Sequence, residues 1–185
     1  MSSAPSSLKR AEARAPRVTL ALRNRQRDRR LNLPFLRRVL RHVLAEEFPG
    51  GGHELGFHFI SAKEMARVNW QFLQHEGSTD VITFDYSQPG DSAPDARRHH
   101  PSPLSGEAFI CVADAVKQAR EFKTSWQSEV VRYAVHALLH LCGYDDLQPA
   151  KRRVMKREEN RLMRKLGQHF NLRSLEKKPA RESRE

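Results

Sequence analysis

Two histidines and an aspartate have the residue types and spacing of a metal site. His136 and His140 are four residues apart in a segment whose apolar pattern predicts a helix. Four residues turn a helix by about 400°, so both imidazole rings would point to nearly the same side and could reach one metal ion. Gly143 follows, and glycine readily adopts the left-handed conformation that ends a helix and reverses the chain. The reversal would bring Asp146 back toward the histidines as a third ligand.

Three protein ligands leave one coordination position open, which is typical of a catalytic zinc site rather than a closed structural one. Asp145 is an alternative third ligand at this stage, and a hydrogen-bonded histidine pair without metal is the alternative for the whole cluster. We interpret Cys142, beside the histidines, as a small buried apolar residue. We predict one Zn²⁺ ion at His136, His140 and Asp146, although the same donors also suit Fe²⁺, Ni²⁺ or Mn²⁺.

Ala137 separates this pattern from that of the zinc proteases. Those enzymes have His-Glu-x-x-His, in which the glutamate acts as general base, and Ala137 stands at the glutamate's position. Peptide hydrolysis by that route is therefore disfavoured. A metal ion could still lower the pKa of a water molecule and polarise a phosphoryl oxygen. The sequence indicates no catalytic side chain beyond the ligands.

The periodicity of apolar residues predicts the elements that must position these ligands. Alternation and β-forming residues predict strands at residues 18–24, 54–60, 80–86 and 107–112. Helical spacing predicts helices at 33–48, 61–73, 113–122, 129–141 and 148–166, with Asn32 and Ser61 as N-caps. We expect one α+β domain in which a small mixed β-sheet is packed with about five helices. The metal site would lie on a central helix and the turn after it.

Both ends of the chain and one internal segment lack this periodicity. We expect residues 1–16 to be a disordered extension and residues 171–185 a charged disordered tail. The folded domain would cover residues 17–170, with an insertion in a connecting loop at 87–104. No segment approaches the roughly 18 apolar residues of a membrane span, and the N-terminus lacks the apolar stretch of a secretory signal. With only two cysteines, a cytoplasmic protein without disulfides is expected.

The formal net charge is +11. Such an excess favours nucleic acid or another anionic partner, with a solvated basic surface as the alternative. Contacts to phosphates give affinity that is independent of base sequence and falls with salt. Trp70, Phe84 and Tyr86 are candidate platforms for unstacked bases, with core packing as the alternative for Phe84. The basic side chains gather at two places, one with Arg23, Arg25, Arg27, Arg29 and Arg30, the other with Lys151, Arg152, Arg153, Lys156, Arg157, Arg161, Arg164 and Lys165.

The segment that carries the three ligands resembles the hallmark of the YbeY family of rRNA-maturation endoribonucleases. The family pattern is His-Gly-x-Leu-His-Leu-x-Gly-Tyr-Asp-His, and this chain has His-Ala-Leu-Leu-His-Leu-Cys-Gly-Tyr-Asp-Asp at residues 136–146. The third metal-binding histidine of the family falls on Asp146. An aspartate can still bind zinc there, as a harder oxygen ligand. The glycine after the first histidine is Ala137, which a helix tolerates.

Further motifs resemble the same family in the same order. Residues 68–84, Val-Asn-Trp-Gln-Phe-Leu-Gln-His-Glu-Gly-Ser-Thr-Asp-Val-Ile-Thr-Phe, are similar to Leu-Asn-x-x-Tyr-Arg-x-x-Asp-x-Pro-Thr-Asp-Val-Leu-Ser-Phe. Residues 106–111 are similar to Gly-Asp-Ile-x-Ile-Cys, and residues 24–26 fit the end of the family's first strand. The arginine of the long motif, which serves the active site in the family, is Leu73 here. His75 is a candidate substrate contact in its place, with an exposed histidine at a helix end as the alternative.

The resemblance, which covers residues 18–166, implies an α+β fold with one metal ion and a metal-dependent endoribonuclease specific for single-stranded RNA. It also implies partners in ribosomal RNA and the small ribosomal subunit, through rRNA 3′-end maturation and ribosome quality control. Water or the RNA's own 2′-hydroxyl could be the nucleophile. Two alternatives remain: a ribosome-assembly RNA-binding factor whose metal is structural, and a zinc hydrolase of another substrate class.

Overall fold

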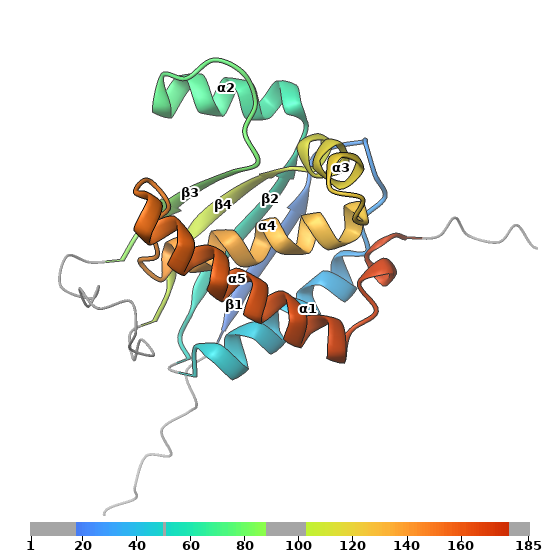
Figure 1. The fold of residues 1–185 in the computed structure, drawn as a ribbon, viewed down its shortest axis with the longest axis vertical. Helices are drawn as coiled ribbons and strands as arrows, with labels where there is room; N and C mark the ends of the chain where they lie inside the picture. Colours follow the sequence, from blue (N-terminus) through green and yellow to red (C-terminus); the bar gives the residue numbers. More distant parts are fainter. Residues whose placement is uncertain (1–17, 50, 88–102, 178–185) are drawn as a thin grey trace, which may run out of the picture.

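The sheet has four strands in the order β1-β2-β4-β3, with β1 (Thr19–Asn24) and β3 (Val81–Asp85) at its edges. β2 (Glu54–Ile60) pairs in parallel with both β1 and β4 (Ser105–Cys111), whereas β3 runs antiparallel to β4. The sheet is therefore mixed, as predicted. The computed structural model describes residues 18–49, 51–87 and 103–177, which are coloured along the chain in Figure 1.

Five α-helices accompany these strands in the described residues: α1 (Leu33–Glu47), α2 (Ala62–Leu73), α3 (Val112–Glu121), α4 (Trp126–Leu141) and α5 (Pro149–His169). The predicted caps are confirmed. Asn32 accepts a hydrogen bond from the backbone N–H of Phe35 at the start of α1, and Ser61 accepts one from Glu64 at the start of α2. A short 3₁₀ helix, η1 (Leu172–Leu175), follows α5.

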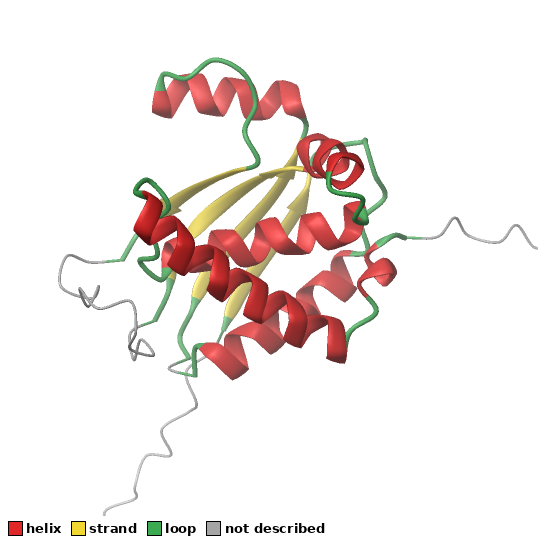
Figure 2. Ribbon diagram, viewed as in Figure 1, coloured by secondary structure: helices red, strands yellow, loops and turns green. Residues whose placement is uncertain are grey.

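Helices α1, α4 and α5 lie over one face of the sheet (Figure 2). The main core fills that interface, where Leu55, Phe57 and Phe59 of β2 meet the apolar sides of α1 and α4. Alternate side chains of a strand point to opposite faces, and Ile60 belongs to a second, smaller core with Met65 of α2. Helix α4, which carries both histidines, is thus held between the sheet and α5.

Two of the boundaries that differ from the sequence prediction have a clear physical cause. Helix α4 begins at Trp126 rather than 129, because Ser125 caps it by accepting a hydrogen bond from the N–H of Ser128 at 3.1 Å. The predicted tail began at residue 171, but η1 continues the packed structure, Leu175 is fully buried, and Glu176 forms a β-bridge with Leu31. That start of the tail was wrong, because a short apolar turn after α5 carries no periodic pattern.

Other expectations fall on parts of the chain that the structure leaves out. The predicted extension at 1–16 lies outside the described residues, as do residues 88–102 of the predicted loop insertion and residues 178–185 of the tail. Within the residues that are described, no helix is both long enough and apolar enough to cross a membrane.

Candidate metal centre

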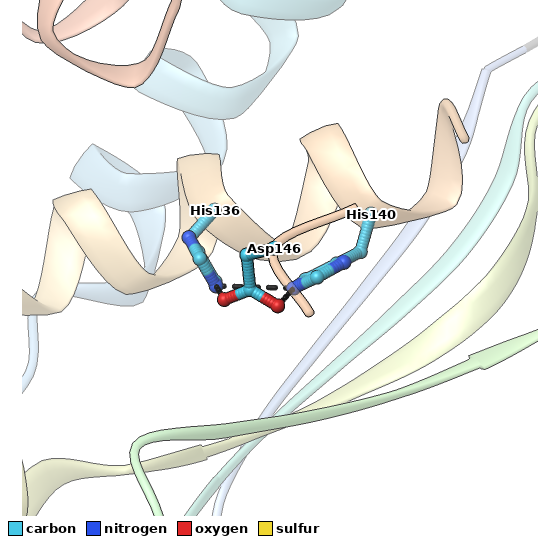
Figure 3. Close-up of side chains that lie close together, drawn as sticks. All are labelled: His136, His140 and Asp146. Atoms are coloured by element: carbon cyan, nitrogen blue, oxygen red, sulfur yellow. Dashed lines mark hydrogen bonds and ion pairs between the residues drawn. The ribbon is translucent and has the colours of Figure 1, made fainter. Parts of the chain in front are cut away.

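The two histidines project from the same side of α4, and the turn after it carries the aspartate toward them (Figure 3). Gly143 has φ = 85°, the left-handed conformation that was expected of it. Its N–H donates to the carbonyl of His140 at 2.9 Å, and the next N–H, of Tyr144, donates to the carbonyl of Leu139 at 3.0 Å. These bonds end the helix and reverse the chain, so that Asp146 faces His136 and His140.

Three ligand atoms converge at this place. Nε2 of His136 lies 3.1 Å from Nε2 of His140, and the carboxylate oxygens of Asp146 lie 3.8 Å and 4.0 Å from the same two atoms. Ligands of a tetrahedral zinc ion, each about 2.1 Å from the metal, would be roughly 3.4 Å apart. The observed separations lie on both sides of that value, and all three residues are only partly buried. His136, His140 and Asp146 could therefore hold one metal ion.

Both imidazole rings are oriented by hydrogen bonds at the nitrogen that faces away from this point. Nδ1 of His136 lies 3.0 Å from a carboxylate oxygen of Glu159 in α5, and Nδ1 of His140 lies 3.1 Å from the backbone carbonyl of Tyr144. A carbonyl oxygen and an ionised carboxylate can only accept, so each Nδ1 must donate. This fixes the tautomer in which Nε2 carries the lone pair, which is the form of histidine that binds a metal.

The short distance between the two Nε2 atoms supports a cation at this place. With both Nδ1 atoms donating, neither neutral ring has a proton left on Nε2. At 3.1 Å the two lone pairs would then face each other without a partner. A shared cation, either a proton or a metal ion, resolves this conflict. The chemistry of the donor set therefore fits a divalent metal ion.

The structure separates Asp146 from its neighbour. One carboxylate oxygen of Asp145 accepts the N–H of Leu147 at 2.9 Å, and the other pairs with Lys151 at 2.9 Å, so Asp145 stabilises the turn before α5. The buried thiol of Cys142 is not in the ligand group either, and burial raises its pKa, which opposes the thiolate that metals bind. The geometry thus favours Asp146 over the alternative that the sequence left open.

A chain of charged side chains lies behind His136. Arg132 of α4 donates to Glu159 at 2.6 Å and lies 3.5 Å from Glu129, which accepts the hydroxyl of Thr124 at 2.6 Å. Burial alone would raise the pKa of Glu159, but hydrogen bonds from His136 and Arg132 hold it below its usual value. Glu159 is therefore ionised, as an acceptor for His136 must be.

The pKa values of the two histidines move in opposite directions. Burial alone would lower the pKa of His136, but the bond to Glu159 outweighs burial and the pKa is raised. Burial and the charge of His136 together lower the pKa of His140. The carboxylate of Glu159 therefore favours positive charge at the ring of His136, whereas the surroundings of His140 favour its neutral form.

A cleft of about 360 Å³ opens beside His136 and Asp146, between α4, α5 and the end of α3. Along α4 the cleft is lined by residues that recur at helical spacing, namely Glu129, Arg132, Tyr133 and His136. The lining residues of α5 recur at the same spacing. Asp80, just before β3, also lines it. The remaining lining residues are Gln118, Phe122, Thr124, Arg152, Met155, Lys156, Glu159 and Asn160.

Sequence reasoning missed Glu159 and Asp80. Glu159 did carry a signal, because it is a charged residue on the buried side of α5, beside Met155, Leu162 and Met163. Asp80 belongs to the long family motif. Its negative charge contributes to the raised pKa of His136, yet nothing in the sequence connects it with a histidine 56 positions later in the chain.

Other predicted residues lie elsewhere. His75 is exposed in the loop after α2 and is absent from the cleft lining, so its contact with substrate stays a prediction. Leu73 is 50% exposed at the end of α2. Trp70 and Tyr86 are exposed, while Phe84 packs edge-on against Phe72 and Phe109. Ala137 is fully buried, so that position of α4 faces the core rather than the metal.

Comparison with known proteins places the chain in a family. The family model described as Endoribonuclease YbeY matches residues 21–167. An endoribonuclease YbeY from Chlorobium phaeovibrioides is 33% identical over 152 residues, which cover 81% of this chain and 92% of the relative. An endoribonuclease YbeY from Salinibacter ruber is 32% identical over 144 residues, covering 78% and 89%.

The fold agrees with a solved structure. The solution structure of a protein from Thermotoga maritima matches with a TM-score of 0.58, covering 89% of this chain and 99% of the other, at 18% sequence identity. That likeness supports the α+β fold alone. The family model and the relatives supply the activity class, that of an RNA-cleaving hydrolase. The chain belongs to the YbeY family of endoribonucleases.

Proposed function

We propose that this chain is a zinc-dependent endoribonuclease that cleaves single-stranded RNA in the cytoplasm. Its substrate in this proposal is ribosomal RNA of the small subunit, at 3′-end maturation and in ribosome quality control. The observation that carries the proposal is the orientation of the two imidazoles. Their Nδ1 atoms donate to Glu159 and to the carbonyl of Tyr144, so that both Nε2 atoms point toward the space beside the carboxylate of Asp146. The cleft beside them offers a place for substrate.

His136, His140 and Asp146 would hold the ion, and two nitrogens with one oxygen suit Zn²⁺. A zinc ion at such a site supplies electrophilic stabilisation of a phosphodiester and acidifies water. The protein's own contribution is orientation. Glu159 keeps the ring of His136 in the metal-binding tautomer, and the turn at Gly143 places Asp146. Arg132 in turn holds Glu159 ionised.

Metal analysis and an RNA cleavage assay on the purified protein test this proposal together. We expect close to one zinc ion per chain and endonucleolytic cleavage of an unstructured RNA. His136→Ala and His140→Ala should remove both the zinc and the cleavage while the circular dichroism spectrum is retained. His169→Ala, an exposed histidine on α5, is the matched control and should behave like the parent. Cleavage by either metal-free variant at the parent's rate would overturn the proposal.

The chemical ends of the products identify the nucleophile. A 2′,3′-cyclic phosphate would mean that the RNA's own 2′-hydroxyl attacks, whereas a 3′-hydroxyl with a 5′-phosphate would mean that water does. Mass spectrometry of a short labelled RNA after cleavage distinguishes these ends.

One observation favours a second candidate, an RNA-binding assembly factor whose metal is structural. The position that carries an arginine in the family motif is Leu73, which is 50% exposed at the end of α2 and gives no charge to the site. Under this alternative, zinc removal would lower the melting temperature and RNA would bind, but no cleavage would be seen with any single-stranded substrate.

A further inference from the structure

Arg152 and Lys156 give the cleft a cationic side. They are four residues apart on α5, which places both side chains on the same face of the helix, and both line the cleft next to His136 and Asp146. In the described part of the chain, no carboxylate lies within ion-pair distance of either side chain. On the same helix, Lys151, Arg161 and Lys165 are each paired with a carboxylate.

Two of the acidic residues in the cleft already have partners. Glu159 accepts hydrogen bonds from His136 and Arg132, and Glu129 accepts one from Thr124 and lies beside Arg132. A carboxylate that is paired in this way contributes little attraction for a second cation. Arg152 and Lys156 are therefore available for an anion that enters the cleft from solvent.

Arg152 is also tied to the third ligand residue. Its Nε donates to the backbone carbonyl of Asp146 at 2.9 Å. That bond holds the guanidinium beside the candidate metal centre, and its two terminal nitrogens have no hydrogen-bond partner among the described residues. A planar guanidinium with two free N–H groups matches the oxygens of a phosphate, and arginine keeps its charge at any working pH.

We propose that Arg152, together with Lys156, binds a backbone phosphate of single-stranded RNA in this cleft. The contact would hold the phosphodiester chain against His136 and Asp146. Phe122, which is 61% exposed, lies on the same cleft and offers an aromatic face for an unstacked base. The inference rests on the proposed function, since it places that substrate at that site.

The other basic cluster is in the wrong place for this contact. Its arginines lie at the end of β1 or directly after it, β1 is the edge strand opposite β3, and none of them lines the cleft. Arg25 is paired with Glu64 at 2.7 Å, and the guanidinium of Arg29 lies over the ring of Trp126. Leu73 supplies no charge. Of the basic residues on α5, Arg152 and Lys156 are the ones that line the cleft.

Arg152→Gln and Arg153→Gln form a matched pair for the test. The two arginines are adjacent, exposed and on one helix, so each variant loses the same charge, but Arg153 does not line the cleft. Fluorescence anisotropy would measure binding of a short fluorescein-labelled oligouridylate, with zinc and with a chelator present. We expect Arg152→Gln to weaken binding by about tenfold and to reduce the salt slope by about 0.7, the value for one phosphate contact on a single strand.

A smaller effect is expected for Arg153→Gln. Equal effects of the two variants would overturn the inference, because net charge alone would then explain both. Zinc affinity separates the contact from a merely structural role of the bond to Asp146. Arg152→Gln should bind zinc like the parent, and Arg152→Lys, which keeps the charge, should regain part of the RNA affinity. A loss of zinc affinity with RNA binding equal to that of Arg153→Gln would also overturn it.

The outcomes distinguish this inference from the proposed function. If the parent binds the oligouridylate and Arg152→Gln selectively weakens that binding, the contact is real even where no cleavage occurs. If the parent cleaves RNA but both variants bind and cleave alike, the proposed function stands and the phosphate contact is refuted.

Discussion

Glu159 of α5 and Nδ1 of His136 in α4 lie 3.0 Å apart, although 23 positions separate them in the chain. The carboxylate is ionised, nearly buried and held by Arg132 on its other oxygen. This contact connects α5 to the candidate metal centre, because it determines which nitrogen of His136 faces Asp146.

The first prediction concerns this contact. Glu159→Gln removes the negative charge that favours the metal-binding tautomer of His136, so zinc affinity should fall by about 10- to 100-fold. Competition with a chromophoric chelator measures the affinity. Glu158→Gln is the matched control, because Glu158 pairs with Arg161 and does not contact His136. Equal zinc affinity in the two variants would show that Glu159 has no such role.

A second prediction distinguishes the two aspartates of the turn. Asp146→Asn should weaken zinc binding by more than about 100-fold, since even the loss of a group behind a ligand costs about 10- to 100-fold. Asp145→Asn should leave zinc affinity near that of the parent, because Asp145 bonds Leu147 and Lys151 instead. Isothermal titration of both metal-free variants measures this, and a larger loss for Asp145→Asn would refute the assignment of Asp146.

A third prediction concerns Gly106 of β4. A Cβ there would lie 2.5 Å from the carbonyl oxygen of Phe84 and 2.7 Å from Cδ2 of Leu141, so the strand and α4 would have to separate. Gly106→Ala should cost about 1–3 kcal/mol, the range for overpacked cores. Gly167→Ala on α5 meets no atom within 4 Å and should instead stabilise by about 0.5–1 kcal/mol. Urea denaturation compares the stability of the two variants. Equal urea midpoints for Gly106→Ala and Gly167→Ala would contradict the packing argument.

The fourth prediction is a pH dependence of stability from Glu47. Burial alone would raise its pKa, but Arg161 and Lys165 hold it below the usual value. A depressed folded-state pKa means that the stabilisation is present above about pH 4.3, the unfolded value, and is lost as pH falls through the folded value. Glu47→Gln should lower the free energy of unfolding by about 1.5 kcal/mol at pH 7. This is the low end of the range for hydrogen bonds to charged groups, because Arg161 is partly solvated.

Urea denaturation of the parent and Glu47→Gln between pH 7 and pH 3 measures this dependence. The two curves should converge at acid pH, because the parent's carboxylate is then protonated. A difference that persists unchanged at pH 3 would mean that packing, rather than charge, stabilises this position.

The sequence was sufficient for features that depend on local rules. Four-residue spacing on a helix fixed the common side of His136 and His140, and the glycine at 143 indicated the reversal before Asp146. Alternation and helical spacing predicted all four strands and all five helices seen in the described residues, within a few residues at their ends. The physical reason is that periodicity and capping involve neighbours a few positions apart.

Only the tertiary structure decided what surrounds the three candidate ligands. Whether Glu159 meets His136, and whether Arg152 reaches Asp146, depends on how α5 packs and rotates against α4. The choice of Asp146 over Asp145 likewise required the direction in which each side chain leaves the turn. A sequence lists these residues without their relative rotation, because that rotation is set by the packing of Met155, Leu162 and Leu166 into the shared core.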